Sequence, residues 1–374
     1  MNNMKALRER FNMTQEELAC ATGISRKTII SIENGKTSPS LEYAYKIAKP
    51  FSVPVEEIFI PYEPRKHYVE KIRYVDVFCG IGGFRYAAEN VFKKSNIPSR
   101  CVFSSDIDKY AKQSYAANFG HEPLGDITKI SVENIPDHEL LFAGFPCQPF
   151  SIIGLGRGFD DMRGTLFFEI ARILRDKAPH AFVLENVKRL VSHEGGATFK
   201  KILQTLRDLD YHVDYKVLNA LDYGLPQKRE RVVIIGSKTP FLMNWQHKSD
   251  IINLSDILEK NVPLKYYASK TIVEKRKSVH TSKYNPSIWH ENKAGNISSY
   301  PYSCALRANA SYNYLLVNGE RRLTPREMLR LQGFPDSFNI VVNDMQIRKQ
   351  AGNAVPVKMI ESVLEEFIPM VFAY

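Results

Sequence analysis

The chain has 374 residues, of which 44% are hydrophobic and 25% charged, and carries a formal net charge of +10 at pH 7. This length predicts more than one domain, the composition is typical of a soluble globular protein, and no apolar run reaches the roughly 18–20 residues that span a bilayer. The charge surplus indicates a polyanionic partner. The five cysteines are scattered without a CxxC pair, which disfavours disulfides and structural zinc and favours a location in the reducing cytoplasm.

The first 60 residues show a helical pattern that is broken at short intervals. Thr14, followed three residues later by Glu17, predicts a capping box at the start of one helix. Gly23 marks a turn, Ser25 caps a second helix, and Gly35 is expected to end it. Two short helices joined by a glycine-containing turn indicate a helix-turn-helix.

Apolar residues of this segment form its expected core: Leu18, Ala19, Ile24, Ile29 and Ile32. Polar residues of the second helix point outward and suit base edges and phosphates: Arg26, Lys27, Thr28 and Ser31. The segment resembles the Cro/repressor-like family, which implies DNA binding by residues 1–60. The alternative is a helical bundle used for dimerisation or as a cap on the main domain. Residues 61–72, with prolines and mixed charges, predict a linker.

Four strand-end signals follow the linker in succession. The apolar run 73–78 leads into the glycine turn CGIGGF and a helix, and the run 100–108 contains Asp106 near its end. The turn GDIT presents Asp126, and LLFA (140–143) is a buried strand. Singly, each acid suits a solvated turn or a helix cap. Together the four signals predict a doubly wound sheet with a nucleoside-like ligand along its carboxyl edge.

The strand ends also carry reactive groups. Cys147 lies between Pro146 and Pro149 on a stiff loop, although a lone cysteine also suits a buried core position. Glu185 directly follows the apolar run AFVL, where a carboxyl is costly unless it is neutralised, paired or used. Arg229 and Arg231 precede the strand VVIIG. The sheet edge is therefore expected to gather a thiol, a carboxyl group and arginines.

These motifs occur in a specific order. DVFCGIGGF, GDIT, GFPCQPFS, RGTLFFEIARIL, FVLENV and DYGLPQKRERVVIIG resemble the ordered motifs of bacterial cytosine-C5 DNA methyltransferases, and RRLTPREMLRLQGFPDSF and QAGNAVPVKMIESVL resemble that family's closing motifs. The resemblance implies an α/β fold with a doubly wound, Rossmann-like methyltransferase domain over 73–236. It also implies a small target-recognition region over 237–320 and closing motifs over 321–374.

The resemblance implies roles that the chemistry of cytosine independently requires. Cys147 would attack C6, Glu185 would donate a proton to N3, Arg231 would hold O2 and Arg229 would support it. The activated C5 would take a methyl group from S-adenosylmethionine, giving S-adenosylhomocysteine without a metal. Because a base inside double-stranded DNA is unreachable, the target cytosine would be flipped out.

The same resemblance implies binding residues. Those for the cofactor are Phe78, Ile81, Gly83, Asp106, Ile107, Asp126, Ile127, Pro146, Leu166 and Asn353. Those for DNA in the catalytic loop are Gln148, Ser151 and Arg163, and in the recognition region Arg307, Asn309, Ser311 and Tyr312. Any one of the recognition residues equally suits a phosphate contact or a plain loop. The chain departs from the family at Cys79, Asp106 and Ala354, where alanine or serine, glutamate and serine are commoner.

The expected function is therefore DNA (cytosine-5) methylation at a short duplex site that protects DNA from a cognate restriction endonuclease. The helix-turn-helix is expected to regulate transcription by binding its own operator as a dimer. One alternative is an RNA cytosine-C5 methyltransferase. Another is a helix-turn-helix regulator whose methyltransferase domain is inert.

Overall fold

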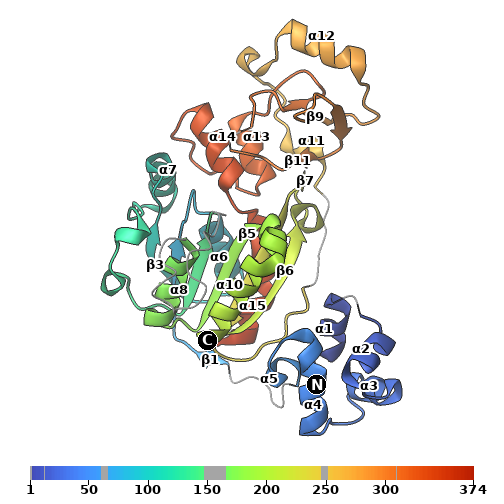
Figure 1. The fold of residues 1–374 in the computed structure, drawn as a ribbon. Coiled ribbons are helices and arrows are strands. Elements are labelled where there is room, and N and C mark those ends of the chain that lie inside the picture. The colour runs from blue at the N-terminus through green and yellow to red at the C-terminus, as the bar shows by residue number, and fades with distance from the viewer. Residues whose placement is uncertain (1, 12, 60–65, 147–165, 246–251, 309) are drawn as a thin grey trace.

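The structure is a computed structural model that describes residues 2–11, 13–59, 66–146, 166–245, 252–308 and 310–374. A helical N-terminal domain lies at one end of a central α/β domain, and a small domain lies at the other end (Figure 1). No helix in these described ranges is long and apolar enough to cross a membrane.

The N-terminal domain has the predicted helix-turn-helix. Its helices are α1 (Met4–Arg10), α2 (Gln15–Thr22), α3 (Arg26–Glu33), α4 (Leu41–Phe51) and α5 (Val55–Ile58). The capping box of Thr14 and Glu17 is present, and the Ser25 hydroxyl accepts the backbone N–H of Thr28. The helix α3 ends at Glu33, two residues before the expected stop at Gly35. All five apolar residues predicted for the core are buried in one cluster.

The central domain contains a six-stranded sheet in the order β3-β2-β4-β5-β8-β6. Its strands are β2 (Ile72–Val77), β3 (Ser99–Ser105), β4 (Leu140–Gly144), β5 (Ala181–Val187), β6 (His212–Asn219) and β8 (Glu230–Ser237). The strand β8 runs antiparallel to both of its neighbours, so the sheet is mixed. The predicted strands lie within a few residues of the observed ones, because runs buried on both faces are apolar without alternation.

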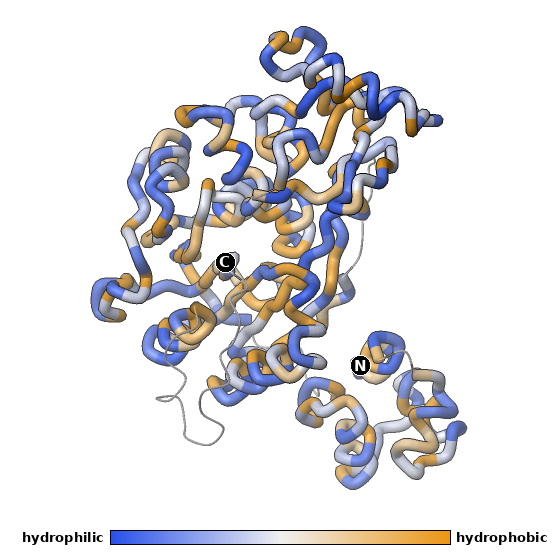
Figure 2. The backbone as a smooth tube through the Cα atoms, turned by 45° about the horizontal axis from the view of Figure 1, so that its top comes forward, coloured by the Kyte–Doolittle hydropathy of each residue, from blue (hydrophilic) through white to orange (hydrophobic). Residues whose placement is uncertain are grey.

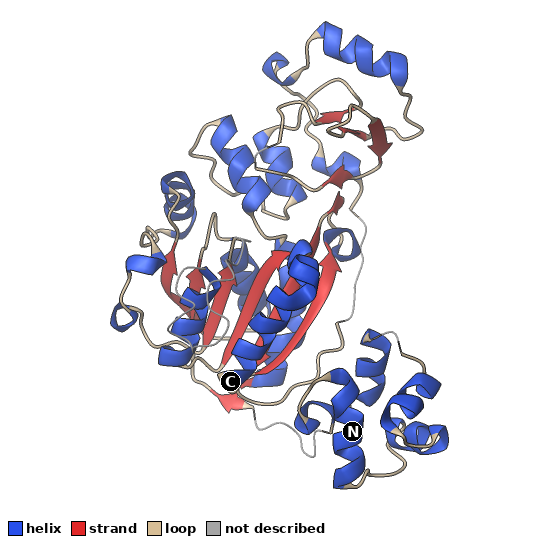
Figure 3. Cartoon of the chain, in the orientation of Figure 1, coloured by secondary structure: helices blue, strands red, loops and turns tan. Residues whose placement is uncertain are grey.

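Helices cover both faces of this sheet (Figure 3). The helices α6 (Gly83–Lys94) and α15 (Val357–Val371) share one core cluster with the strands, and α8 (Leu166–Lys177) and α10 (Ala197–Asp208) share the other. Figure 2 shows hydrophobic residues along the central strands. The helix α7 (Lys109–Phe119) follows β3, α9 (Arg189–Ser192) follows β5, and β1 (His67–Tyr68) pairs with β13 (Phe372–Ala373).

The small domain is more regular than its polar sequence suggests. Its elements are α11 (Leu254–Ile257), α12 (Lys270–Val279), β9 (Ile288–Glu291), β10 (Ile297–Tyr300) and β12 (Leu315–Val317). The strand β11 (Ser303–Cys304) pairs with β7 (Gln227–Lys228) of the central domain. Leu331 of α13 (Pro325–Leu331) and Ala351 of α14 (Asp344–Asn353) belong to the small domain's core. The expected division at residue 320 therefore does not coincide with a division in packing.

The N-terminal domain docks on the sheet edge that β6 forms. Arg10 makes an ion pair with Asp214 of β6, and its guanidinium lies 4.0 Å from the ring centre of Tyr215. Glu57 lies 3.6 Å from Arg207 of α10. Asp214 and Tyr215 belong to the amino-terminal half of β6 and Arg207 to the last turn of α10, so the contacts lie away from the carboxyl ends of the parallel strands.

Candidate active site

An open cleft of about 540 Å³ lies at the carboxyl ends of β2, β3, β4 and β5. It gathers nine of the ten residues predicted to bind a cofactor: Phe78, Ile81, Asp106, Ile107, Asp126, Ile127, Pro146, Leu166 and Asn353. Gly83 does not line the cleft. A Cβ at Gly83 would lie 2.7 Å from a methyl group of Val355, so this glycine permits close packing behind the cleft.

The glycine turn after β2 is held to β3 by one carboxylate. Asp106 accepts the backbone N–H of Gly80 and that of Asp108, both at 2.8 Å. Burial raises the pKa of Asp106 above its usual value, although both hydrogen bonds oppose this shift. Phe78 adopts a φ of +56°, which is uncommon for a residue with a side chain and is typical of a functional turn.

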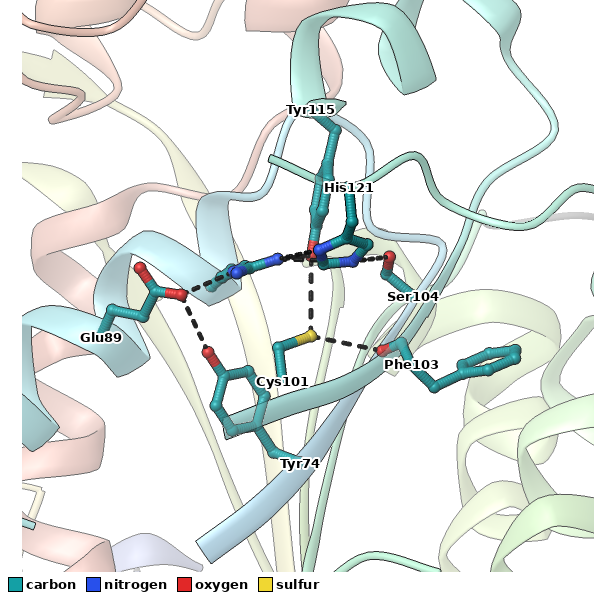
Figure 4. A network of polar contacts seen from close by, with 8 residues as sticks. Tyr74, Glu89, Cys101, Phe103, Ser104, Tyr115 and His121 are labelled. Carbon is teal, nitrogen blue, oxygen red and sulfur yellow. Dashed lines mark hydrogen bonds and ion pairs between the residues drawn. The ribbon is translucent and has the colours of Figure 1, made fainter. Parts of the chain in front are cut away.

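A network behind the turn connects α6 to α7 and β3 (Figure 4). Arg85 donates to Glu89 at 2.6 Å and to the Tyr115 hydroxyl at 3.3 Å, and its Nη1 lies 3.0 Å from Nδ1 of His121. The His121 ring in turn meets the Ser104 hydroxyl at 2.9 Å. These contacts fix the start of α6, and with it the glycine turn.

Two further cleft residues show how a nucleoside could be held. Asp126 accepts from the backbone and the hydroxyl group of Thr128, which lowers its pKa and keeps it an ionised acceptor. Ile107 exposes 77% of its surface in the cleft. An apolar side chain so exposed offers a face to a flat ring.

The carboxyl group of Glu185 and the guanidinium of Arg231 meet in the same cleft. Arg231 Nε lies 2.7 Å from Glu185 Oε1, so the two side chains form a largely buried ion pair. Burial raises the pKa of Glu185, and the two nearby arginines only partly offset it. The carboxyl group can therefore hold and deliver a proton.

Arg229 connects three parts of the chain through backbone carbonyls. It donates to Leu306 at 3.0 Å, Gly352 at 3.0 Å and Ala354 at 2.8 Å. Its side chain is fully buried, and burial together with Arg231 lowers its pKa to about 9. Arg229 thus joins the cleft to the recognition region and to the closing motif.

Sequence reasoning missed some cleft residues. Gln350 lines the cleft, and its buried Nε2 has no partner among the described residues, while its Oε1 accepts from Ser114 at 3.0 Å. Lys349 pairs with Asp108 across the rim at 2.6 Å. The motif QAGNAVPV contains Gln350, but only the tertiary fold brings α14 to the mouth of the cleft.

Several predicted residues lie outside the described ranges: Cys147, Gln148, Ser151, Arg163 and Asn309. Pro146, which directly precedes the predicted nucleophile, is exposed and lines the cleft together with Glu185 and Arg231.

The remaining predicted DNA contacts are accessible. Arg307, Ser311 and Tyr312 are exposed on the small domain, away from the cleft lining. On α3, Arg26 and Lys27 are exposed, and Thr28 and Ser31 are half-buried. The Ser31 hydroxyl lies 2.6 Å from that of Thr37, and Arg26 lies 3.5 Å from Glu16.

Comparisons with known proteins assign the chain to two families. The model of the C-5 cytosine-specific DNA methylases matches residues 72–368, and a helix-turn-helix model matches residues 4–58. The type II methyltransferase M.NgoBI of Neisseria gonorrhoeae is 54% identical over 77% of this chain and 90% of its own. M1.ScrFI of Lactococcus lactis subsp. cremoris is 43% identical over 98% and 94%. The crystal structure of S. pombe Dnmt2, at 20% identity, covers 80% of this chain and 98% of its own with a TM-score of 0.61.

Proposed function

Because the chain belongs to the C-5 cytosine-specific DNA methylase family, we propose that the residues of this cleft carry out the methyl transfer. The protein is a DNA (cytosine-5)-methyltransferase of the type II restriction–modification class, to which relatives with 40–54% identity belong. The RNA alternative has no support in the comparisons, since the matching family model is that of a DNA methylase. The observation that carries the mechanism is the meeting of Glu185, Arg231 and the predicted cofactor residues in one cleft.

In the proposed mechanism, the thiolate of Cys147 forms a bond to C6 of the target cytosine. The electron pair of the C5–C6 double bond moves toward C5 while N3 takes the proton of Glu185. Burial supports this role because it favours the protonated carboxyl group. Arg231 donates to O2 and stabilises the charge that develops on the ring. Once C5 carries the methyl group, water takes the C5 proton, the Cys147 thiolate leaves C6 as the C5–C6 double bond re-forms, and N3 returns its proton to Glu185, which restores the enzyme.

Residues of the cleft fit S-adenosylmethionine, which when bound supplies the electrophilic methyl group and leaves as S-adenosylhomocysteine. Asp106 would accept from the ribose hydroxyls and Asp126 from the adenine amine. The exposed face of Ile107 would cover the adenine ring. The N–H groups of Gln350, which have no acceptor among the described residues, add a donor to the cleft. No group of acids, histidines or cysteines in the described ranges is arranged to hold a metal.

The cleft also has room for the target base. Its volume of about 540 Å³ lies within the roughly 300–1,000 Å³ of an ordinary small-molecule pocket, and it opens to the solvent. Because Glu185 and Arg231 line the same cleft as the predicted cofactor residues, we infer that a flipped cytosine is held there beside the cofactor. Extrusion costs a few kcal/mol, which contacts from the catalytic loop and the small domain would offset.

The experiment that tests this mechanism is bisulfite sequencing of random-sequence plasmid DNA treated with the protein and S-adenosylmethionine. We expect protection of one cytosine within one short recurring motif, and no protection with Cys147→Ser. Methylation that persists in Cys147→Ser would exclude Cys147 as the nucleophile. Wild-type protein that binds the cofactor yet protects no cytosine would favour the regulator with an inert methyltransferase domain.

The N-terminal domain supports a second role on DNA. We infer that it binds an operator near its own gene as a dimer and so regulates transcription. The exposed Arg26 and Lys27 of α3 suit phosphates and base edges, and M1.ScrFI aligns with 98% of the chain, including this domain. Protection from a partner endonuclease would complete the restriction–modification pair, with both enzymes acting on DNA in the cytoplasm.

Operator binding is tested with the full chain by footprinting on the DNA upstream of the gene. The double change Arg26→Ala and Lys27→Ala should abolish the footprint and leave methylation intact, whereas Cys147→Ala should do the reverse. A variant lacking residues 1–65 that kept its operator affinity would exclude the N-terminal domain as the operator-binding unit.

A further inference from the structure

An exposed tyrosine of the recognition region lies between two arginines of the closing segment. The Tyr312 ring centre is 4.8 Å from the guanidinium carbon of Arg322, just before α13, and 4.8 Å from that of Arg348 in α14. Tyr312 exposes 51% of its surface. Guanidinium groups at this distance stabilise an aromatic ring by cation–π attraction and restrict its rotation.

Arg348 also holds the backbone beside this tyrosine. Its Nη2 donates to the carbonyl oxygens of Ala310 at 2.5 Å and Ser311 at 2.6 Å. The Arg348 guanidinium lies 5.7 Å from the Tyr314 ring as well. One side chain of α14 therefore fixes both the backbone and the ring orientation of residues 310–312.

The arginines around Tyr312 form no ion pairs with carboxylates of the described residues. Among the described residues, no carboxylate lies within 4.0 Å of a nitrogen of Arg307, Arg322 or Arg348. The neighbouring Asp344 is occupied by Lys265 at 2.7 Å and by the Tyr266 hydroxyl at 2.8 Å. The buried Nε of Arg322 has no hydrogen-bond partner in this part of the structure. Such a surplus suits the polyanionic backbone of a duplex.

We propose that Arg348, assisted by Arg322, is a specificity-determining positioning residue that acts through Tyr312 and the backbone of residues 310–311. The proposal rests on the predicted contacts of Arg307, Ser311 and Tyr312 with DNA. Discrimination requires that contacting groups keep one geometry, because a loop that can adjust makes comparable contacts with the wrong base pair. Arg348 belongs to α14, whose later residues line the cleft. Its contacts therefore fix the position of the recognition segment relative to the active site.

The test compares kcat/KM on a duplex with the cognate site and on duplexes with one changed base pair. Discrimination is the ratio of kcat/KM on the cognate duplex to kcat/KM on a changed duplex. With Arg348→Gln, we expect this ratio to fall about tenfold, the scale of one good base contact, while kcat on the cognate site changes little. Arg348→Lys should not restore it, because an ammonium group lacks the planar fork that donates to two carbonyls and stacks on the ring.

The matched control is Arg326→Gln. Arg326 also donates to two backbone carbonyls, those of Pro335 and Phe338, and among the described residues it makes no hydrogen bond to the recognition segment. Its loss should leave discrimination unchanged. Adding Arg348→Gln to Tyr312→Leu should relax discrimination by less than Arg348→Gln does alone, because the two residues act together.

The outcomes separate the two proposals. If Arg307→Ala relaxes discrimination while Arg348→Gln and Tyr312→Leu do not, the positioning role is overturned and base contact by the segment stands. If Arg307→Ala also leaves discrimination unchanged, the segment does not read bases and both proposals fail. If Arg348→Gln does not fold, Tyr312→Leu decides, because this exposed ring can be shortened without a change in the core.

Discussion

Glu185 illustrates how position within one strand gives a side chain its chemistry. The four residues before it, Ala181 to Leu184, are fully buried, so the end of β5 lies at the inner wall of the cleft. A carboxyl group there loses solvation, and Arg231 approaches it from the neighbouring strand β8. The opposing effects leave a carboxyl group whose pKa is raised, beside a fixed positive charge.

We predict that Glu185→Gln lowers kcat by about 10²–10⁴-fold, the usual contribution of proton transfer, while the affinity for DNA and cofactor is kept. An amide can donate a hydrogen bond to N3 but cannot transfer a proton. The ratio of wild-type to variant kcat/KM should fall as the pH rises, because only the wild-type carboxyl group loses its proton. Steady-state kinetics between pH 6 and 9 measures this ratio, and a pH-independent ratio would contradict the role.

Asp76 is a second buried acid, and it lies outside the cleft lining. Both of its carboxyl oxygens lack a hydrogen-bond partner among the described residues, and the side chain is fully buried on β2. Burial raises its pKa to about 8, against the smaller effect of Arg85. In the unfolded chain the pKa is about 4, so between these values the folded state holds an additional proton.

The free energy of unfolding should therefore fall by up to about 1.4 kcal/mol per pH unit as the pH rises from about 4 to 8. Asp76→Asn keeps the shape and cannot ionise, so we predict that it removes this part of the pH dependence. Urea unfolding of both proteins at several pH values gives the difference, which should favour the variant increasingly at higher pH. Curves that stay parallel would show that Asp76 is ionised in the folded protein.

At the scale of elements, the active site depends on how closely the closing helix α14 meets the recognition segment. A Cβ at Gly352 would lie 2.4 Å from the backbone nitrogen of Ala308 and 2.8 Å from the carbonyl carbon of Arg307. Arg229 fastens the same junction from the central domain through the carbonyls of Leu306 and Gly352. The backbone of α14 lies directly against the backbone of the recognition segment. A larger residue at Gly352 therefore cannot be accommodated unless one of the two segments moves.

We predict that Gly352→Ala destabilises the protein by about 1–3 kcal/mol, the usual cost of an overpacked interior site. Separation of α14 from the recognition segment should also raise KM for DNA. Gly125→Ala is the control for stability, because a Cβ there meets nothing within 4 Å and its φ is not positive. Thermal unfolding compares the two variants, and equal midpoints would show that the junction is not tight in solution.

At the scale of the whole molecule, two DNA-binding units lie at opposite ends of one sheet (Figure 1). M.NgoBI aligns with 77% of this chain and M1.ScrFI with 98%. Some relatives therefore match this chain along almost its whole length, and others match a stretch about as long as its methylase domain. The contacts of the N-terminal domain, Arg10 with Asp214 and Glu57 with Arg207, fall on β6 and α10, away from the cleft.

We predict that Arg10→Ala weakens this docking by about 1 kcal/mol, because the ion pair is only partly exposed and its geometry includes the Tyr215 ring. Calorimetry should show the N-terminal domain unfolding at a lower temperature, with the methylation rate unchanged. Lys5→Ala, an exposed position on the same helix, is the control. A lowered methylation rate in Arg10→Ala would mean that the interface also supports catalysis.

The sequence by itself determined the local features, because short-range chemistry dictates them. The capping box at Thr14, the buried strand that carries Glu185, and the glycine turn before Gly83 are all specified by neighbouring residues. The order of the motifs determined the family, and nine predicted cofactor residues line one cleft. Gly83 was assigned from its motif alone, and only packing against Val355 shows that it lies behind the cleft.

Only the tertiary structure decided which distant segments meet. Arg229 contacts Gly352, 123 positions away, and Arg348 contacts Tyr312, 36 positions away. Gln350 reaches the cleft mouth from a separate helix. No periodicity in the sequence indicates such contacts. The sequence also did not predict that β8 runs antiparallel to β5, or that α13 and α14 share a core with the small domain. The physical reason is that long-range partners are selected by the packing of whole elements, whereas the sequence pattern records only the side on which each residue is buried.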